Sequence, residues 1–165
     1  MKYMQIEEPV GDISRYSTER PMDILKIVIS LDNRTFLVNM EDETKVNEND
    51  ISGEIVKHSS TFAWWASLNA FAKRLLRAHK RDLESLIFSL DEKARHSLTQ
   101  NGLKVTEQAV KSWLMNNTTV QRLGEEVTKL EDAVEYTDVL LKTLDHRRDM
   151  LKELARLRFR ESVNP

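Results

Sequence analysis

Hydrophobic positions along the chain follow a helical period from Glu54 onwards. Up to about Gln100 they recur mostly at spacings of three and four, which places them on one face of a helix over residues 54–100. Gly102 follows, and a glycine here can adopt the left-handed conformation that ends a helix. The apolar face comprises Ile55, Phe62, Trp65, Leu68, Ala72, Leu75, His79, Leu83, Leu86, Leu90 and Ala94, with His79 interpreted as a satisfied core histidine.

A second pattern keeps a strict seven-residue repeat as far as Leu151. Thr106 offers an N-cap oxygen and Glu107 suits the positive end of a helix dipole, so we predict one helix from 108 to about 160. That helix would be about 80 Å long and must pair with the first and overrun it. Its seam consists of two ladders: Trp113, Val120, Val127, Val134, Leu141, and Asn116, Leu123, Leu130, Thr137, Leu144, Leu151.

Two members of these ladders are polar, Asn116 and Thr137. Polar residues in a coiled-coil seam fix the register at some cost in stability. The alternative is that both side chains face a partly wet groove, and the sequence leaves this open.

The first 53 residues differ in composition and lack the helical pattern of apolar residues. Residues 1–20 mix charges with proline and glycine and are predicted to be a flexible lead. Over residues 24–40, two apolar, β-branched runs flank Asp32-Asn33, which predicts a β-hairpin; a short helix starting at Pro21 is the alternative. Residues 41–53 are acidic and rich in turn formers, as a connector would be.

The predicted fold is therefore mostly α. A long antiparallel helical hairpin, coiled-coil-like, carries a small N-terminal appendage and oligomerises through its helices. We place the appendage and connector at 1–53, and the helical hairpin at 54–165.

Composition argues against an enzyme. The chain has no cysteine, its four histidines are scattered without metal-ligand spacing, and its four glycines form no phosphate loop. We therefore expect no catalytic residue, no metal and no cofactor. No apolar run approaches the ~20 residues of a membrane span, so a cytoplasmic protein without membrane contact is expected.

The formal charge of -2 conceals a segregation of charge. Residues 61–105 hold eight bases against four acids. Such a basic surface can capture a nucleic-acid backbone, and Trp64, an aromatic side chain off the apolar face, is the candidate for base stacking. The alternative is that these cations pair with the acids of residues 125–138 on the opposite helix. The candidate phosphate contacts are Lys73, Arg74, Arg77, Lys80, Arg81, Lys93 and Arg95.

A second basic cluster runs from Arg147 to Arg160. It could complement the negative end of its own helix dipole, meet phosphates, or dock an acidic partner. The sequence alone leaves all three roles open.

The order of these features resembles the UvsY-type recombination mediators of tailed bacteriophages. The similar segments are the acidic Asp42–Val46, the aromatic-rich Ile55–Leu68, Lys93-Ala94-Arg95 and the leucine-rich, basic Leu140–Leu154. Residues 1–40 and the final Arg156–Arg160 have no counterpart.

The resemblance implies a non-enzymatic homo-oligomer, ring-like in assembly, that acts in DNA recombination and repair. Such a protein binds single-stranded DNA, helps displace the single-strand-binding protein and loads a RecA-like recombinase, in the host cytoplasm if the chain is phage-encoded. Lys93 and Arg95 are the matched DNA contacts. Our candidates for packing between subunits are Val127, Leu130, Val134, Leu141, Leu144 and Leu151.

A different class of function remains beside it. A non-catalytic coiled-coil scaffold, or a regulator that binds a protein partner without nucleic acid, would use the same cations for solvation and pairing.

Overall fold

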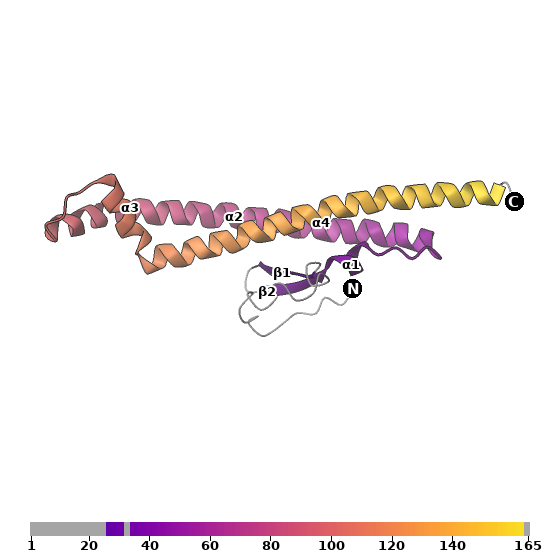
Figure 1. The fold of residues 1–165 in the computed structure, drawn as a ribbon, viewed down its shortest axis with the longest axis horizontal. Helices are drawn as coiled ribbons and strands as arrows, with labels where there is room; N and C mark the ends of the chain where they lie inside the picture. Colours follow the sequence, from indigo (N-terminus) through magenta and orange to yellow (C-terminus); the bar gives the residue numbers. More distant parts are fainter. Residues whose placement is uncertain (1–25, 32–33, 164–165) are drawn as a thin grey trace. The chain divides into compact units, whose positions relative to one another are not determined.

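A computed structural model describes residues 26–31 and 34–163, and Figure 1 shows the order of their elements. These are β1 (Lys26–Leu31), β2 (Arg34–Asn39), α1 (Met40–Thr44), α2 (Ile51–Gln100), α3 (Glu107–Met115) and α4 (Thr118–Val163). The two long helices pack against each other, and a two-stranded sheet precedes them, so the predicted mostly α fold is confirmed. The predicted flexible lead and the Asp32-Asn33 turn lie outside the described residues.

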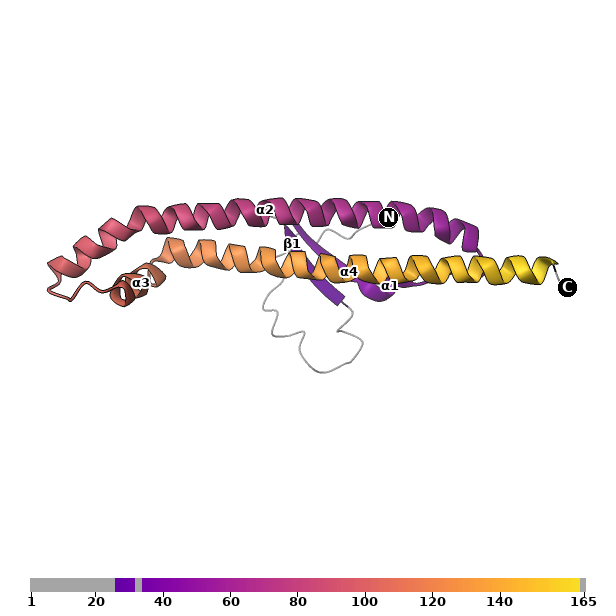
Figure 2. The ribbon, with the colours of Figure 1, turned by 90° about the horizontal axis from the view of Figure 1, so that it is seen from above.

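The predicted β-hairpin is confirmed over the helical alternative. β1 and β2 pair antiparallel, with Lys26 opposite Asn39 and Leu31 opposite Arg34. Because side chains alternate along a strand, Ile29, Leu31 and Val38 lie on one face, and all three are buried. Figure 2 shows both strands running obliquely across the helices.

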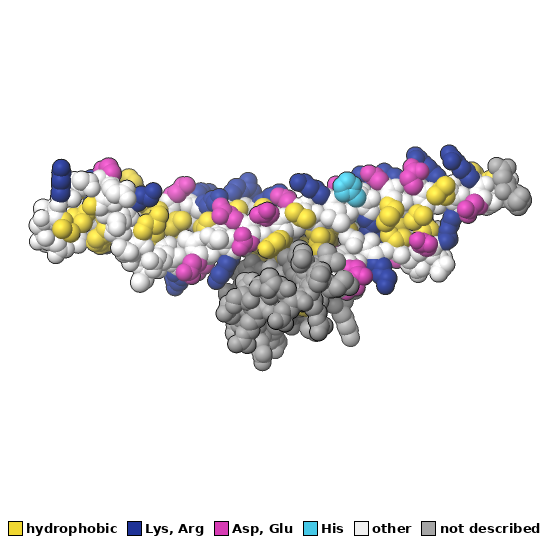
Figure 3. Space-filling model, in the orientation of Figure 1, with side chains coloured by type: hydrophobic (Ala, Val, Ile, Leu, Met, Phe, Trp, Pro, Cys, Tyr) yellow, Lys and Arg dark blue, Asp and Glu magenta, His cyan; other side chains and the backbone are white. Residues whose placement is uncertain are grey.

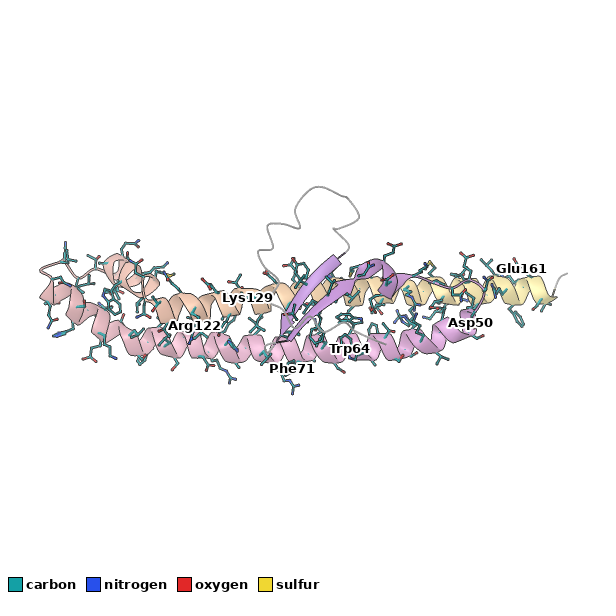
Figure 4. All side chains as sticks on the ribbon, turned by 90° about the horizontal axis from the view of Figure 1, so that it is seen from below. Asp50, Trp64, Phe71, Arg122, Lys129 and Glu161 are labelled. Carbon is teal, nitrogen blue, oxygen red and sulfur yellow. The ribbon has the colours of Figure 1, made fainter. Side chains whose placement is uncertain are left out.

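The connector is shorter and more ordered than expected. It contains α1, whose N-cap Asn39 accepts the backbone N–H of Glu41. α2 then begins at Ile51, three residues earlier than predicted, because the Asp50 carboxylate accepts the backbone N–H of Gly53 at 2.9 Å. Asp50 stands at the start of α2 in Figure 4.

The predicted end of α2 is confirmed in detail. Gly102 has φ 67, in the left-handed region. Its N–H donates to the carbonyl of Thr99, and the N–H of Leu103 donates to the carbonyl of Leu98, both at 3.0 Å. This is the paired hydrogen bonding of a Schellman motif. Thr106 then caps α3 by accepting the N–H of Ala109, as expected.

The single helix predicted over 108–160 is wrong, because the chain breaks at Asn116-Asn117. Asn117 accepts the N–H groups of Thr119 and Val120 through its side-chain oxygen, as an N-cap does. Asn116 is exposed and ends α3 rather than entering the seam. An asparagine side chain competes with the helical backbone for hydrogen bonds, and two in succession favour the interruption.

The chain divides into two compact units, and both long helices run through both. Among the described residues, the sheet unit comprises 26–31, 34–71 and 132–163, and the turn unit comprises Ala72–Glu131. One buried cluster of the turn unit consists of Ala94, Leu98, Val110 and Leu114. In the sheet unit the largest fully buried side chains are Trp65, Ile29, Leu140, Leu144, Leu151 and Thr137. The boundary predicted at residue 53 stays a prediction.

The apolar face of α2 is mostly as predicted. Trp65, Ala72 and Ala94 are buried and the others half-buried, except Ile55, which is 42% exposed. The expectation for Ile55 is wrong. Buried residues of this part of α2 recur every seven positions, at Ile51, His58, Trp65 and Ala72. Ile55 lies beside this row and is therefore exposed.

The seam of α4 changes register along the helix. Leu130, Thr137, Leu144 and Leu151 are buried as one ladder. In the sheet unit the second buried ladder is Ala133, Leu140 and Arg147, and the expected Val134 and Leu141 are half-buried.

Thr137 has the register-fixing environment rather than a wet groove. It is fully buried, and the Asn69 side-chain amide donates to its hydroxyl at 2.7 Å. The same amide donates to Asp138 at 3.0 Å. Since a one-residue slip would leave these polar groups unpaired in the interior, the cluster favours a single register.

Candidate nucleic-acid interface

Two of the predicted phosphate contacts lie on the outer face of α2 in the turn unit. Arg77 and Arg81 are one helical turn apart, exposed, and make no ion pair among the described residues. At about 100° per residue, both point away from the face that buries Ala72 and half-buries Leu83. This geometry leaves two guanidinium groups available for an anion from solution.

Lys80 is differently placed. Its ammonium lies 2.6 Å from the Glu131 carboxylate on α4. The preceding residue, His79, is half-buried, and its Nδ1 lies 3.5 Å from a Glu126 carboxylate oxygen without a hydrogen-bond partner among the described residues, so it is not the satisfied core histidine expected. For Lys80, pairing with the acids of 125–138 is therefore what the structure has.

Arg95 is also committed to neighbouring acids. It donates to Asp91 at 2.7 Å and to Glu107 at 2.8 Å, the latter on α3. The hydrogen bond to Asp91, followed by that to Glu107, raises the pKa of Arg95 above its usual range. Its place in the fold is a link between the end of α2 and the start of α3.

Lys93 is exposed and makes no ion pair among the residues described. It lies about 120° around α2 from Arg81, as the twelve-residue separation dictates, so the two do not share a face. Lys73 and Arg74 are exposed and make further interactions of their own. The seven candidate cations therefore do not form one continuous surface.

Trp64 does not offer the open ring that base stacking needs. It is half-buried and meets Trp65 edge-on, with ring centroids 4.5 Å apart. A second edge contact, at 6.2 Å, joins it to Phe36 of β2. Trp64 lies next to the strands in Figure 4, and its contacts there hold the sheet against α2.

The C-terminal basic cluster is largely engaged within the chain. Arg147 is 4% exposed and pairs with Glu54. It also donates to the carbonyls of Thr44 and Lys45, at 3.3 and 3.2 Å. It therefore joins α4 to α1, the connector and α2 rather than forming part of a basic surface.

The exposed members of that cluster pair mostly along their own helix. Arg148 pairs with Asp145 and Asp149, Lys152 with Asp149, and Arg156 with Glu153. The hydrogen bonds from Arg148 and Lys152 lower the pKa of Asp149. Figure 3 shows the resulting surface, with acidic and basic side chains interspersed over the helices.

The candidates for packing between subunits are mostly covered within a single chain. Val127, Leu130, Leu144 and Leu151 are buried, and Val134 and Leu141 are half-buried. A side chain covered in this way does not meet a second subunit unless the helices separate.

Sequence reasoning missed two exposed apolar features of the turn unit. Phe88 is 86% exposed, seven residues after Arg81 on α2; the available signal was its position off the apolar face. The second is an apolar groove of about 810 Å³, lined by Leu83, Ile87, Met115, Val120, Gln121, Gly124, Glu125, Thr128 and Lys129. It depends on the break after Met115, which the heptad pattern did not reveal.

The described part of the chain also lacks metal sites and membrane-spanning helices. Within residues 26–31 and 34–163, no three side chains of the ligand-forming types gather as a metal site. None of the helices there has an apolar stretch of the length a bilayer requires. Comparison with protein-family models, with curated proteins and with solved structures finds no match to this chain.

Proposed function

We propose that this chain is a non-enzymatic recombination mediator. It binds single-stranded DNA, helps displace the single-strand-binding protein and helps load a RecA-like recombinase. The mediator role rests on the resemblance in the sequence, and the binding of a polyanion rests on one observation. That observation is the exposed pair Arg77 and Arg81, which lies opposite the packed face of α2 and has no acidic partner among the described residues.

The pair is suited to a flexible polyanion. A cation that neutralises a phosphate displaces counterions condensed on the nucleic acid, and this release drives binding. A cation already paired with a carboxylate of its own chain neutralises a phosphate less effectively than a cation without such a partner. Lys80 and Arg95 fall in the first group, and Arg77 and Arg81 in the second. We therefore narrow the proposed site to Arg77 and Arg81, with Lys93 as a separate contact on another face.

Fluorescence anisotropy with a labelled thymidine oligonucleotide tests the proposal. Arg77→Ala with Arg81→Ala is expected to weaken binding at least tenfold at low salt. A control of equal charge is Lys111→Ala with Arg122→Ala, on α3 and α4, both exposed in the same unit. If both double variants lose the same affinity, the loss reflects the net charge of the protein and not a site at Arg77 and Arg81. If the wild type does not bind the oligonucleotide, the proposed function is refuted.

Lys93→Ala and Arg95→Ala are separate tests within this scheme. Lys93→Ala removes a cation and no contact among the described residues, so any loss of affinity is electrostatic. Arg95→Ala also breaks the link to Asp91 and Glu107. Its thermal unfolding has to be measured before an affinity change is assigned to DNA.

Assembly into a homo-oligomer is part of the proposal, on a face of α4 other than the buried seam. In the sheet unit, Tyr136, Val139, Met150 and Leu157 are 42–51% exposed. Three of them share one heptad position, at residues 136, 150 and 157. The occupant we assign to this face is α4 of a second copy of this chain.

Charge supports an antiparallel pairing of these two helices. The exposed residues at seven-residue spacing beside this face alternate in sign: Glu135, Lys142, Asp149 and Arg156. About a two-fold axis between residues 145 and 146, Glu135 meets Arg156 of the other copy, and Lys142 meets Asp149. Within one chain Arg156 also pairs with Glu153, and Asp149 with Arg148 and Lys152. Such a self-complementary contact is what a two-fold interface requires.

A second candidate is a coiled-coil scaffold that binds a protein partner. The apolar groove beside Met115 favours it, as does the pairing of Lys80 and Arg95 with acids. In this case the wild type shows no oligonucleotide binding at near-physiological salt, and substitution of Arg77 and Arg81 changes nothing.

A further inference from the structure

Phe88 occupies the same face of α2 as Arg77 and Arg81, which make no ion pair within the described part of the chain. Residues 77, 81 and 88 are separated by four and seven positions, which at about 100° per residue keeps them within about 40° of one another. Along the axis, Arg77 and Arg81 are about 6 Å apart and Phe88 follows about 10 Å further on. All three are exposed in the turn unit.

The exposure of Phe88 stands out among the large apolar side chains. At 86% it exceeds every other described large hydrophobic residue, including Val56 at 74% and Phe159 at 71%. A single exposed apolar residue is common on a protein surface. Phe88 differs from such residues because it lies beside Arg77 and Arg81. An exposed aromatic ring next to two cations that make no ion pair among the described residues has the composition of a single-strand binding surface.

The chemistry of this surface favours an unpaired strand over a duplex. Guanidinium groups bind phosphates, and an aromatic ring stacks on a base face that is accessible only when the base is unstacked. A peptide partner would satisfy Phe88 but not the two arginines unless it were acidic. Glu84 and Glu92 lie on the same face and are exposed, and they oppose an acidic peptide and a phosphate chain alike.

We infer that Phe88, Arg77 and Arg81 form one binding surface for single-stranded nucleic acid, in which a base stacks on Phe88 while the arginines hold the neighbouring phosphates. This inference rests on the proposed function and adds that the affinity for the strand depends on its bases as well as on its phosphates. The stacking residue is Phe88 and not Trp64, whose ring is engaged with Trp65 and Phe36. Stacking makes the surface tolerant of sequence, since every base has an aromatic face.

The test compares two labelled 12-nucleotide strands with the same number of phosphates, one of thymidine and one abasic. The wild type is expected to bind the thymidine strand about tenfold more tightly, the order of one base stacked on an aromatic side chain. Phe88→Ala abolishes this preference, and Phe88→Tyr, which keeps the ring, retains it. Arg77→Ala with Arg81→Ala weakens both strands alike and leaves their ratio unchanged.

Phe159→Ala is the matched control, because Phe159 is an exposed phenylalanine beside arginines on α4. It is expected to leave the ratio at the wild-type value. Glu84→Gln is expected to tighten both strands about two- to threefold by removing a like charge from the phosphates.

The outcomes separate the two proposals. If the wild type binds neither strand, the proposed function fails and this inference with it. If it binds both strands equally, or if Phe88→Ala keeps the preference, DNA binding stands and the stacking surface is refuted. A loss in Phe159→Ala equal to that in Phe88→Ala also contradicts it, because the effect then does not belong to this face of α2.

Discussion

At the scale of single residues, Arg147 is the clearest case of a side chain whose role depends on its surroundings. In the sequence it belongs to a basic cluster, next to Arg148. In the fold it occupies a seam position of α4, seven residues after Leu140, and its guanidinium reaches Glu54 and the carbonyls of Thr44 and Lys45. Charge pattern alone did not separate the buried arginine from its exposed neighbour.

Removing one partner of this buried pair should cost considerable stability. Arg147→Ala is expected to lower the free energy of unfolding by about 3–5 kcal/mol, because a nearly buried carboxylate and two carbonyls lose their donor. Urea denaturation followed by circular dichroism measures this. The double variant Arg147→Leu with Glu54→Leu should recover much of the loss, since neither then leaves a buried charge.

An exposed pair on the same helix provides the comparison. Arg156→Ala breaks the contact with Glu153, in which both side chains are more than 60% exposed, and should change stability by about 0.5 kcal/mol or less. Similar small losses for Arg147→Ala and Arg156→Ala would contradict the buried role of Arg147.

His58 makes stability depend on pH. It is buried, and its Nδ1 has no hydrogen-bond partner in the described part of the chain. Its pKa is lowered by burial first and then by the charges of Arg147 and Arg148, with Asp145 opposing. The unfolded chain then takes up a proton more readily than the folded one, so stability is lost as the pH falls below about 6.5.

Thermal unfolding at pH 7.5 and 5.5 checks this expectation. The fall in melting temperature on acidification should be smaller for His58→Leu than for the wild type, because the variant has no proton to take up at this position. An unchanged pH dependence in His58→Leu would show that its titration does not contribute.

At the scale of elements, helix ends were predictable where a residue type strongly prefers one capping position. Gly102 at a C-cap and Thr106 at an N-cap carry strong local preferences, and both act as expected. The break at Asn116-Asn117 was missed because the seven-residue repeat continues through it. Asparagine is tolerated in a seam and at a helix end alike, and tertiary packing decides between the two.

The glycines of these elements predict opposite effects of the same substitution. At Gly124, inside α4, an added Cβ meets nothing within 4 Å, so Gly124→Ala should stabilise by about 0.5–1 kcal/mol. Gly102 has equal room but φ 67, so Gly102→Ala should destabilise by about 1 kcal/mol or more. Denaturation midpoints that move in the same direction for both would contradict this assignment.

The faces of the helices were harder to predict than their ends. A stripe at three- and four-residue spacing identified Trp65, Ala72 and Ala94 as core, yet it also included the exposed Ile55. Of the candidate site, the sequence identified the type and region of the cations. It could not identify which of them α3 and α4 neutralise, because Glu107 and Glu131 approach only in the folded chain.

At the scale of the whole molecule, the proposed assembly depends on the second face of α4 rather than on its seam. Met150→Glu with Leu157→Glu places charges on that face and should reduce the solution mass measured by light scattering. Helical content should not change, because both side chains are about half exposed. An unchanged mass would remove this face from the interface.

A matched variant tests the polarity of that assembly. Lys142→Glu should weaken self-association, because Asp149 then faces a like charge. Adding Asp149→Lys should restore it, as the opposite charges are regained with their signs exchanged. If the double variant associates no better than Lys142→Glu alone, the antiparallel register is wrong.

The proposed DNA binding depends most on Arg77 and Arg81 being available to phosphates, and the salt dependence of binding measures this directly. For single strands the slope of log Kobs against log salt concentration changes by about 0.7 for each phosphate neutralised. Arg77→Ala with Arg81→Ala should therefore make the wild-type slope shallower by about 1.4, while Lys111→Ala with Arg122→Ala leaves it unchanged. A wild type with no measurable slope, or a slope unaltered by loss of Arg77 and Arg81, would contradict the account.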